Sequence, residues 1–389
     1  MIKNNPIFLL AIRSIPLISR PIVLILEKSL IPLESSLQII VMPISMLCLG
    51  FMAIPIHKNY YLSTKNKATE ESKYLGLLIP IFGYGLIFSV ILTFTVSTNS
   101  FLIFLIVIFC VVIEKMSDEI CRYLEFQKKF IQWFSVQMLR NLWPIFVFIY
   151  ILFSEGNYLF ATFSFSGLTL FSVFVIMKKN FKNKPVITFS NLLEIFETSL
   201  YLPLNYLPSL LRQAPRLFIA SFSPQYAHGY QLFAQFAQSA SLIFDVIFNI
   251  PYRKAISRHP LMILRIFRNY FFYTSIICLL ISTISLIISL FLESNAFFDV
   301  NIMLFPILIS DSLLIAIYAT FISYIFWSSD VKESLKYAFK LLFILLLCFI
   351  VFYFINYLNL VETILLVPYI ISICTATSSL YIYIKKLNT

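Results

Sequence analysis

Long apolar runs fill almost the whole sequence, and only short polar breaks separate them. A helix needs about 20 apolar residues to cross the hydrocarbon core of a bilayer, and most of these runs reach that length. Only 12% of the 389 residues are charged, whereas a soluble domain carries about 25%. The sequence therefore predicts a polytopic membrane protein and argues against a soluble domain with a single anchor.

The runs predict an all-α fold of about twelve transmembrane helices, because a backbone in lipid must satisfy its own hydrogen bonds. They lack the alternation of polar and apolar residues that is typical of barrel strands. The expected spans are residues 6–27, 35–56, 74–97, 99–116, 130–153, 157–177, 191–217, 228–250, 267–291, 297–325, 336–358 and 361–384.

Lysines and arginines gather in alternate breaks between these spans. By the positive-inside rule, those breaks and both termini are expected in the cytoplasm. This placement accounts for the net charge of +11 without a nucleic-acid partner, although a basic face also attracts anionic membrane lipids. The cations of these breaks are Lys58, Lys65, Lys67 and Lys73; Lys115, Arg122, Lys128 and Lys129; Lys178, Lys179, Lys182 and Lys184; Arg253, Lys254, Arg258, Arg265 and Arg268; and Lys332, Lys336 and Lys340.

One long basic break, residues 178–190, lies near the middle of the chain. It predicts an N-terminal six-helix bundle over residues 1–180, a cytoplasmic linker over 181–190 and a C-terminal six-helix bundle over 191–389.

A few arginines fall within the spans or near their ends. A charge in the bilayer costs a few kcal/mol, so such residues usually face a protein interior or a watery cavity. A cavity lined by guanidinium groups suits a pyrophosphate, since their forked donors match phosphate oxygens. The alternative is that these side chains extend to the lipid headgroups. The candidate substrate-binding residues are Arg13, Arg20, Arg140, Arg212 and Arg216.

Prolines accompany the arginines in the first and seventh spans, which open the two predicted halves. Interrupted helices at corresponding positions point to the central site of a transporter. They are Pro16 and Pro21 in the first span, and Pro203, Pro208 and Pro215 in the seventh.

Other polar residues follow single helical faces in the seventh and eighth spans. They either line the cavity, where amides suit sugar hydroxyls, or form hydrogen bonds between helices. These residues are Asn205, Gln231, Gln235, Gln238 and Asn249. Three acids, Glu197, Asp245 and Asp311, either pair with an arginine or titrate during ion coupling. No phosphate loop, metal-ligand spacing or catalytic triad stands out, so we expect neither a cofactor nor catalysis.

Two stretches resemble polysaccharide flippases of the multidrug/oligosaccharidyl-lipid/polysaccharide exporter superfamily. The first is RLFIASFSPQYAHGY, residues 216–230, in which Arg216 matches an arginine, Gly229–Tyr230 a turn, and the later Pro251 the close of the next helix. Pro215 replaces the acid that commonly precedes the arginine. The second is RYLEFQKKFIQWFSVQMLRNL, residues 122–142, which resembles the fourth loop and fifth helix of those proteins.

The resemblance implies a V-shaped pair of six-helix bundles in the bacterial inner membrane. It implies a lipopolysaccharide O-antigen or capsule repeat unit as substrate, linked to undecaprenyl pyrophosphate and moved to the periplasmic leaflet. A glycan polymerase and a chain-length regulator are the implied partners.

Two other functions fit the same pattern. A membrane O-antigen polymerase or ligase shares the length, the number of spans and the use of arginines, but it is expected to carry a large periplasmic loop. A small-solute exporter of the same superfamily is the other alternative, and arginines within the spans favour an anionic substrate over cationic drugs.

Overall fold

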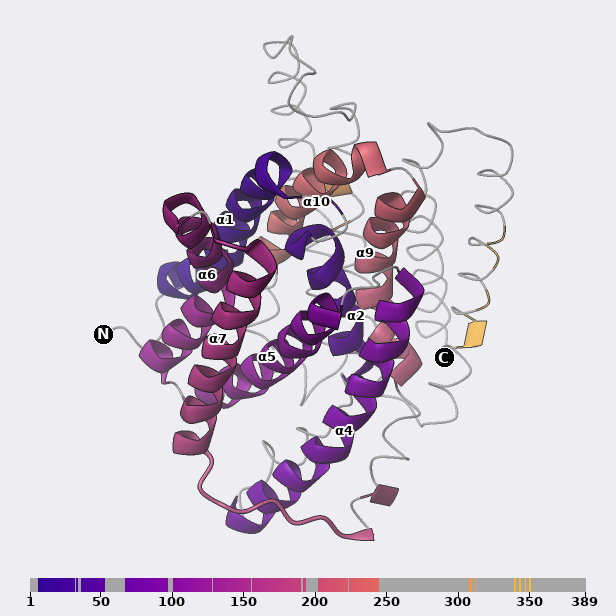
Figure 1. Ribbon diagram of the computed structural model, residues 1–389. Helices are drawn as coiled ribbons and strands as arrows, with labels where there is room; N and C mark the ends of the chain where they lie inside the picture. The colour runs from indigo at the N-terminus through magenta and orange to yellow at the C-terminus, as the bar shows by residue number, and fades with distance from the viewer. Residues whose placement is uncertain are drawn as a thin grey trace. The chain divides into compact units, whose positions relative to one another are not determined.

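The computed structural model describes the chain over residues 6–31, 33, 36–52, 67–96, 101–127, 129–154, 156–189, 192–193, 202–222 and 224–244, with single positions between 308 and 350. Regular structure in these ranges is helical and includes no strand, as the sequence predicts. Figure 1 labels most of these helices. They are α1 (Pro6–Leu30), the short π-helix η2 (Leu37–Val41), α2 (Met42–Phe51), α4 (Lys67–Val96), α5 (Phe101–Phe126), α6 (Phe130–Ser154), α7 (Tyr158–Asn180), α9 (Leu202–Phe222) and α10 (Pro224–Phe244).

Most helices in the first half agree with the predicted spans, but three bounds differ by five residues or more. Helix α4 begins at Lys67, seven residues before the predicted start at residue 74. Helix α2 ends at Phe51 rather than at residue 56, and its capping residue is Met52. Helix α5 continues to Phe126, well past residue 116. The charges that suggested an end to this span are accommodated inside the helix, where residues four apart lie on one face and pair.

Three helical segments of the described chain are long and apolar enough to cross a membrane, namely Glu70–Thr93, Phe130–Ser154 and Tyr158–Asn180. Large apolar side chains are exposed along one face of α7, including Phe160, Leu168 and Phe171. Soluble monomers rarely expose apolar patches of this kind. The protein is therefore a membrane protein, whereas the identity of the membrane and the side of the termini stay predictions.

Helix α5 is the core of the first half of the chain. It contacts α2, α4, α6 and α7, which surround it in Figure 1. Nearly every side chain between Cys110 and Cys121 is buried. A helix that is covered on all sides belongs to the interior of a bundle, so the charges in this stretch must find partners within the protein.

The chain divides into two compact units. Unit 1 contains the described residues from Ile18 to Leu202, and unit 2 contains Pro6–Leu17 with the described residues from Pro203 onward. The boundary falls within α1, so Arg20 belongs to unit 1 and Arg13 to unit 2. The predicted domains, 1–180 and 191–389 with a linker at 181–190, stay predictions.

The predicted linker region lies against α4 in unit 1. Residues 181–188 are not helical. The backbone N–H groups of Lys182 and Asn183 donate to the Glu71 carboxylate at 2.8 and 3.1 Å, and Val186 N–H donates to the carbonyl of Ser72 at 3.0 Å. We call this stretch, residues 181–188, the docked segment.

A large aromatic side chain and a glycine allow this close packing. Phe181 is buried, with its ring centroid 4.7 Å from that of Tyr123 and 6.2 Å from that of Tyr74. A Cβ atom on Gly76 would lie only 2.0 Å from the carbonyl oxygen of Val186. Only glycine therefore lets the segment approach α4 this closely.

Several predictions fall outside the described residues. The spans expected at 267–291, 297–325, 336–358 and 361–384 do so, apart from the single described positions, and so do Glu197, Asp245, Asn249, Pro251 and Asp311.

Candidate functional site

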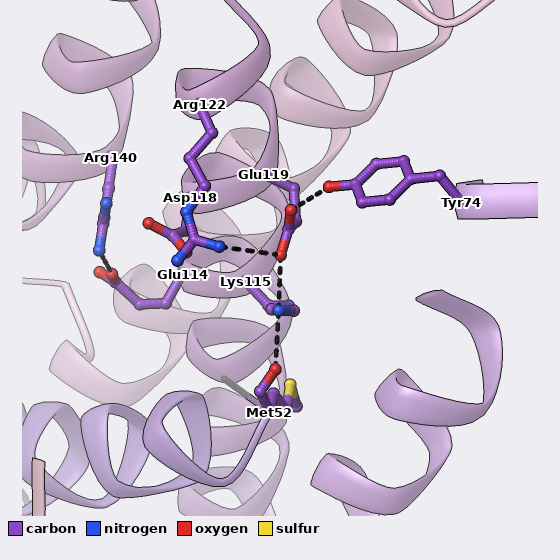
Figure 2. A network of polar contacts seen from close by, with 8 residues as sticks. All are labelled: Met52, Tyr74, Glu114, Lys115, Asp118, Glu119, Arg122 and Arg140. Atoms are coloured by element: carbon purple, nitrogen blue, oxygen red, sulfur yellow. Dashed lines mark hydrogen bonds and ion pairs between the residues drawn. The ribbon is translucent and has the colours of Figure 1, made fainter. Parts of the chain in front are cut away.

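A run of charged residues occupies the buried C-terminal half of α5. Glu114, Lys115 and Glu119 are each only 1% exposed. Isolated buried charges are very costly, so each needs a partner of opposite charge or several hydrogen bonds. Figure 2 shows that Glu114 meets Arg140, whereas Lys115 and Glu119 meet each other in a second set of contacts.

The first set, here called the guanidinium cluster, contains Arg20 of α1, Glu114 of α5 and Arg140 of α6. Arg140 Nη2 donates to Glu114 Oε2 in a buried ion pair, drawn in Figure 2. Arg20 lies near enough for Glu114 to attract its guanidinium and for Arg140 to repel it. Glu114 therefore pairs directly with Arg140 and attracts Arg20 from a greater distance, and Asp118 on the next turn of α5 also attracts Arg140.

The guanidinium cluster also holds unused hydrogen-bond donors. Arg140 Nε is buried and has no partner among the described residues, nor does any of them bond the Arg20 guanidinium. One turn away on the same helices, Ser117 Oγ and Trp143 Nε1 are also buried and have no partner in the described part of the chain. An unused buried donor costs about 1–3 kcal/mol, so this arrangement favours an additional acceptor.

The second set, the lysine cluster, joins α5 to α2 and α4. Lys115 Nζ donates to Glu119 Oε1 at 2.6 Å and to the backbone carbonyl of Met52 at 2.9 Å. The hydroxyl group of Tyr74 donates to Glu119 Oε2. All four residues are labelled in Figure 2. Here a buried lysine and a buried glutamate pair directly, and Arg122 Nη1 lies 3.9 Å from Glu119 Oε1. Both buried charges have further hydrogen bonds, which offsets the cost of removing them from water.

The cationic end of α5 is more exposed. Arg122 Nη2 lies 2.6 Å from Asp118 Oδ2, and the two side chains are 31% and 27% exposed. Such a pair one helical turn apart contributes only a few tenths of a kcal/mol. We therefore assign no role to it in the candidate site, and Arg122 serves below as a control.

A third buried carboxylate, near the C-terminal end of α1, connects this helix to the start of η2 and to α7. Glu27 is fully buried and accepts hydrogen bonds from Ser36 Oγ at 2.6 Å, from Leu37 N at 2.7 Å and from Tyr158 Oη at 3.1 Å. All of these partners are donors, as an ionised carboxylate requires. Glu27 therefore fixes the start of the η2–α2 helix.

Unit 2 contains other predicted site residues. Arg216 of α9 is buried, at 6% exposure, and donates to Gln213 Oε1 at 3.3 Å. Arg212 is half-buried one turn earlier. Burial of this kind argues against extension of Arg216 toward lipid headgroups. In unit 1, the 14% exposure of Arg140 argues against such an extension of that side chain. Arg13 and Asn205 are placed on α1 and α9 by their backbones.

The predicted polar face of the eighth span lies on α10. Gln231 and Gln235 are buried, and Gln238 is half-buried. Their burial fits either lining of a cavity or hydrogen bonding between helices, so both interpretations stay open.

One motif assignment was wrong. Gly229 and Tyr230 lie within α10, which begins at Pro224, and so they do not form a turn. The polar segment after Ser221 contains Pro224, which is favoured at the start of a helix because its missing N–H needs no partner there. Helix α9 ends at Phe222 and α10 begins at Pro224, both ahead of the predicted turn.

Sequence reasoning missed the carboxylates of the guanidinium and lysine clusters. It also assigned Lys115 to a cytoplasmic loop, whereas this lysine lies buried within α5. Charged residues four apart resemble a solvated helix end. The available signal was the absence of any Gly or Pro between residues 101 and 126, which favours one continuous helix through the charged run.

Comparisons with known protein families, curated proteins and solved structures give no match to this chain. The resemblance to flippases therefore stays a prediction, and function must be argued from the charges and contacts of the site. Among the described residues, no group of His, Cys, Asp or Glu side chains could hold a metal ion. What the described site offers is two arginines near one directly paired carboxylate, Glu114, with a buried guanidinium donor that has no partner among the described residues.

Proposed function

We propose that this protein is a flippase that moves a lipid-linked sugar bearing a diphosphate across the membrane. The observation that carries the proposal is the guanidinium cluster, in which Arg20 and Arg140 share Glu114 inside a bundle of apolar helices. An arginine at membrane depth without an ion pair of its own is costly and is usually retained for function. A diphosphate supplies the acceptors and the negative charge that this cluster lacks.

The chemistry of the cluster supports a phosphate-bearing substrate over a cationic one. Guanidinium groups form paired hydrogen bonds with phosphate oxygens, whereas a cationic drug would be repelled by their positive charge. In this proposal the substrate is an undecaprenyl-pyrophosphate-linked repeat unit, and its isoprenoid tail stays in the lipid.

The proposed mechanism is alternating access by two helical bundles in the bacterial inner membrane, with both termini in the cytoplasm. The arginines hold the diphosphate while the polar headgroup crosses. Moving the phosphate through the low-dielectric bilayer core is the main barrier, since an isolated charge there costs many kcal/mol. Guanidinium groups fixed in the path would lower this barrier.

The test is transport by the full chain in proteoliposomes that contain undecaprenyl-pyrophosphate-linked N-acetylglucosamine. A galactosyltransferase added outside labels only the sugar in the outer leaflet, so the slow phase of labelling measures flipping. Each of Arg20→Gln and Arg140→Gln should lower the flipping rate by about tenfold or more, the effect of losing one charge-assisted hydrogen bond of about 1.5–3 kcal/mol.

Arg122→Gln is the matched control. It removes an arginine whose neighbour Asp118 lies at the exposed end of α5, and it should leave the flipping rate within about twofold of the wild type, because exposed pairs contribute little. Flipping at wild-type rate by both Arg20→Gln and Arg140→Gln would refute the cationic site. Failure of the wild-type protein to flip this lipid at all would refute the substrate class.

A further inference from the structure

The single carboxylate of the guanidinium cluster occupies the place where an anionic substrate would bind. Glu114 is 1% exposed and pairs with Arg140, and it also attracts Arg20. A carboxylate and a phosphate offer the same kind of acceptor to a guanidinium group. A diphosphate that approaches Arg140 must therefore compete with Glu114 for that guanidinium.

The competition between Glu114 and the diphosphate affects how readily the diphosphate leaves the site. A site that holds its ligand through two guanidinium groups in a medium of low dielectric binds strongly, because charges attract more strongly there than in water. A transport site must instead bind weakly enough to let its cargo leave. When the phosphate leaves, a carboxylate that returns to Arg140 neutralises the positive charge of the guanidinium. The free energy needed to release the phosphate is therefore lower.

We propose that Glu114 is an internal counter-ion that exchanges with the substrate diphosphate at Arg140 and so limits its affinity. This inference rests on the proposed function and specifies how its site is regulated. In the unloaded state Glu114 holds Arg140 and attracts Arg20 without a direct bond, so Arg20 is the cation that first meets the diphosphate. In the loaded state both arginines bind phosphate oxygens, and the Glu114–Arg140 pair is broken.

The test is binding of inorganic pyrophosphate to the full chain in lipid nanodiscs, measured by titration calorimetry. Glu114→Gln keeps the shape of the side chain and an oxygen that accepts a hydrogen bond from Arg140, but it removes the competing charge. It should bind pyrophosphate about tenfold more tightly than the wild type and should flip the lipid-linked sugar more slowly at saturating substrate. Arg140→Gln added to Glu114→Gln should abolish the gain in affinity.

Glu119→Gln is the matched control, because Glu119 is another 1%-exposed carboxylate on α5 that is paired with a cation. It removes the same charge from the same helix, yet it should leave the pyrophosphate affinity within about twofold of the wild type. An equal gain in both variants would mean a general effect of net charge and would overturn the counter-ion role.

The outcomes separate this inference from the proposed function. If the wild type binds pyrophosphate and Glu114→Gln binds it equally or more weakly, the counter-ion role is wrong and the anion site stands. If neither protein binds pyrophosphate, the anion site itself fails. Should Glu114→Gln not insert stably, Glu114→Asp replaces it: the shorter carboxylate weakens the pair with Arg140, and an affinity that does not rise contradicts the inference.

Discussion

The guanidinium cluster and the lysine cluster lie on the same helix, and their central residues, Glu114 and Lys115, are neighbours in the sequence. Consecutive helical residues point about 100° apart, so the two side chains serve different neighbours. Lys115 and Glu119 balance each other and have further bonds to Met52 and Tyr74. Glu114, in contrast, is one carboxylate beside two arginines.

The difference separates a structural role from a binding role. A balanced and fully bonded pair has no capacity for a ligand, and it fixes the positions of α2, α4 and α5. In the guanidinium cluster, Arg140 Nε is a buried donor without a partner among the described residues, so the proposed binding role is that an additional acceptor, such as a phosphate oxygen, occupies this place. Burial alone does not distinguish the two, since Glu114, Lys115 and Glu119 are equally buried.

The strongest test of this comparison removes one charge from the lysine cluster. Lys115→Met leaves Glu119 buried without its main partner, which should lower the free energy of unfolding by about 3–5 kcal/mol. Denaturant unfolding in mixed micelles measures this loss. The pyrophosphate affinity of the protein that remains folded should stay unchanged, because the lysine cluster does not bind substrate.

The double variant Lys115→Met/Glu119→Gln provides the control. It removes both charges and keeps an oxygen that accepts the Tyr74 hydrogen bond, so most of the lost stability should return, because replacing a buried pair as a whole is often neutral. A double variant that stays as unstable as Lys115→Met would contradict the balanced-pair interpretation. Loss of flipping in the stable double variant would assign the lysine cluster to the transport site.

A second test asks whether the docked segment, like the lysine cluster, has a structural role and no role in binding. Gly76→Ala places a Cβ atom 2.0 Å from the Val186 carbonyl oxygen, so the segment must move away from α4. Overpacking of this kind costs about 1–3 kcal/mol. In nanodiscs, trypsin should cut after Lys182 faster than in the wild type.

Gly83→Ala on the same helix is the matched control, because no atom lies within 4 Å of its added Cβ. It should leave the cleavage rate unchanged and favour the helix slightly, since alanine is a better helix former than glycine. Equal cleavage in both variants would show that the segment is not held at Gly76. Pyrophosphate affinity should not respond to either change.

The sequence predicts the membrane-spanning, all-helical character of the described chain well, because hydrophobic length is a local property. Helix α6 agrees with its predicted span within a residue at its end. The sequence also identifies Arg20 and Arg140 as unusual, because charges in apolar runs are rare. Their common partner Glu114 could not be found in this way, since pairing between α1, α5 and α6 depends on packing.

The charged run of α5 also shows what the sequence can predict about charge pairs and what it cannot. Spacing alone gives Lys115–Glu119 and Asp118–Arg122 as possible pairs within the helix, and both pairs exist. Only packing shows that the first is buried against Met52 and Tyr74 while the second is half-exposed. The sequence therefore predicts which charges can meet along one helix, whereas their burial depends on the neighbouring helices.

The smallest expected effect comes from Tyr74→Phe, which removes the hydroxyl donor to Glu119 and keeps the ring beside Phe181. Glu119 retains Lys115 as its partner, so the free energy of unfolding should fall by only about 1 kcal/mol, the net contribution of one hydrogen bond. Denaturant unfolding resolves this change, while trypsin cleavage of the docked segment and pyrophosphate affinity should both match the wild type. A gain in pyrophosphate affinity as large as that of Glu114→Gln would mean that the two clusters form one coupled network, because the only atom removed lies in the lysine cluster. An unchanged affinity would confine the anion chemistry to the side of α5 that carries Glu114.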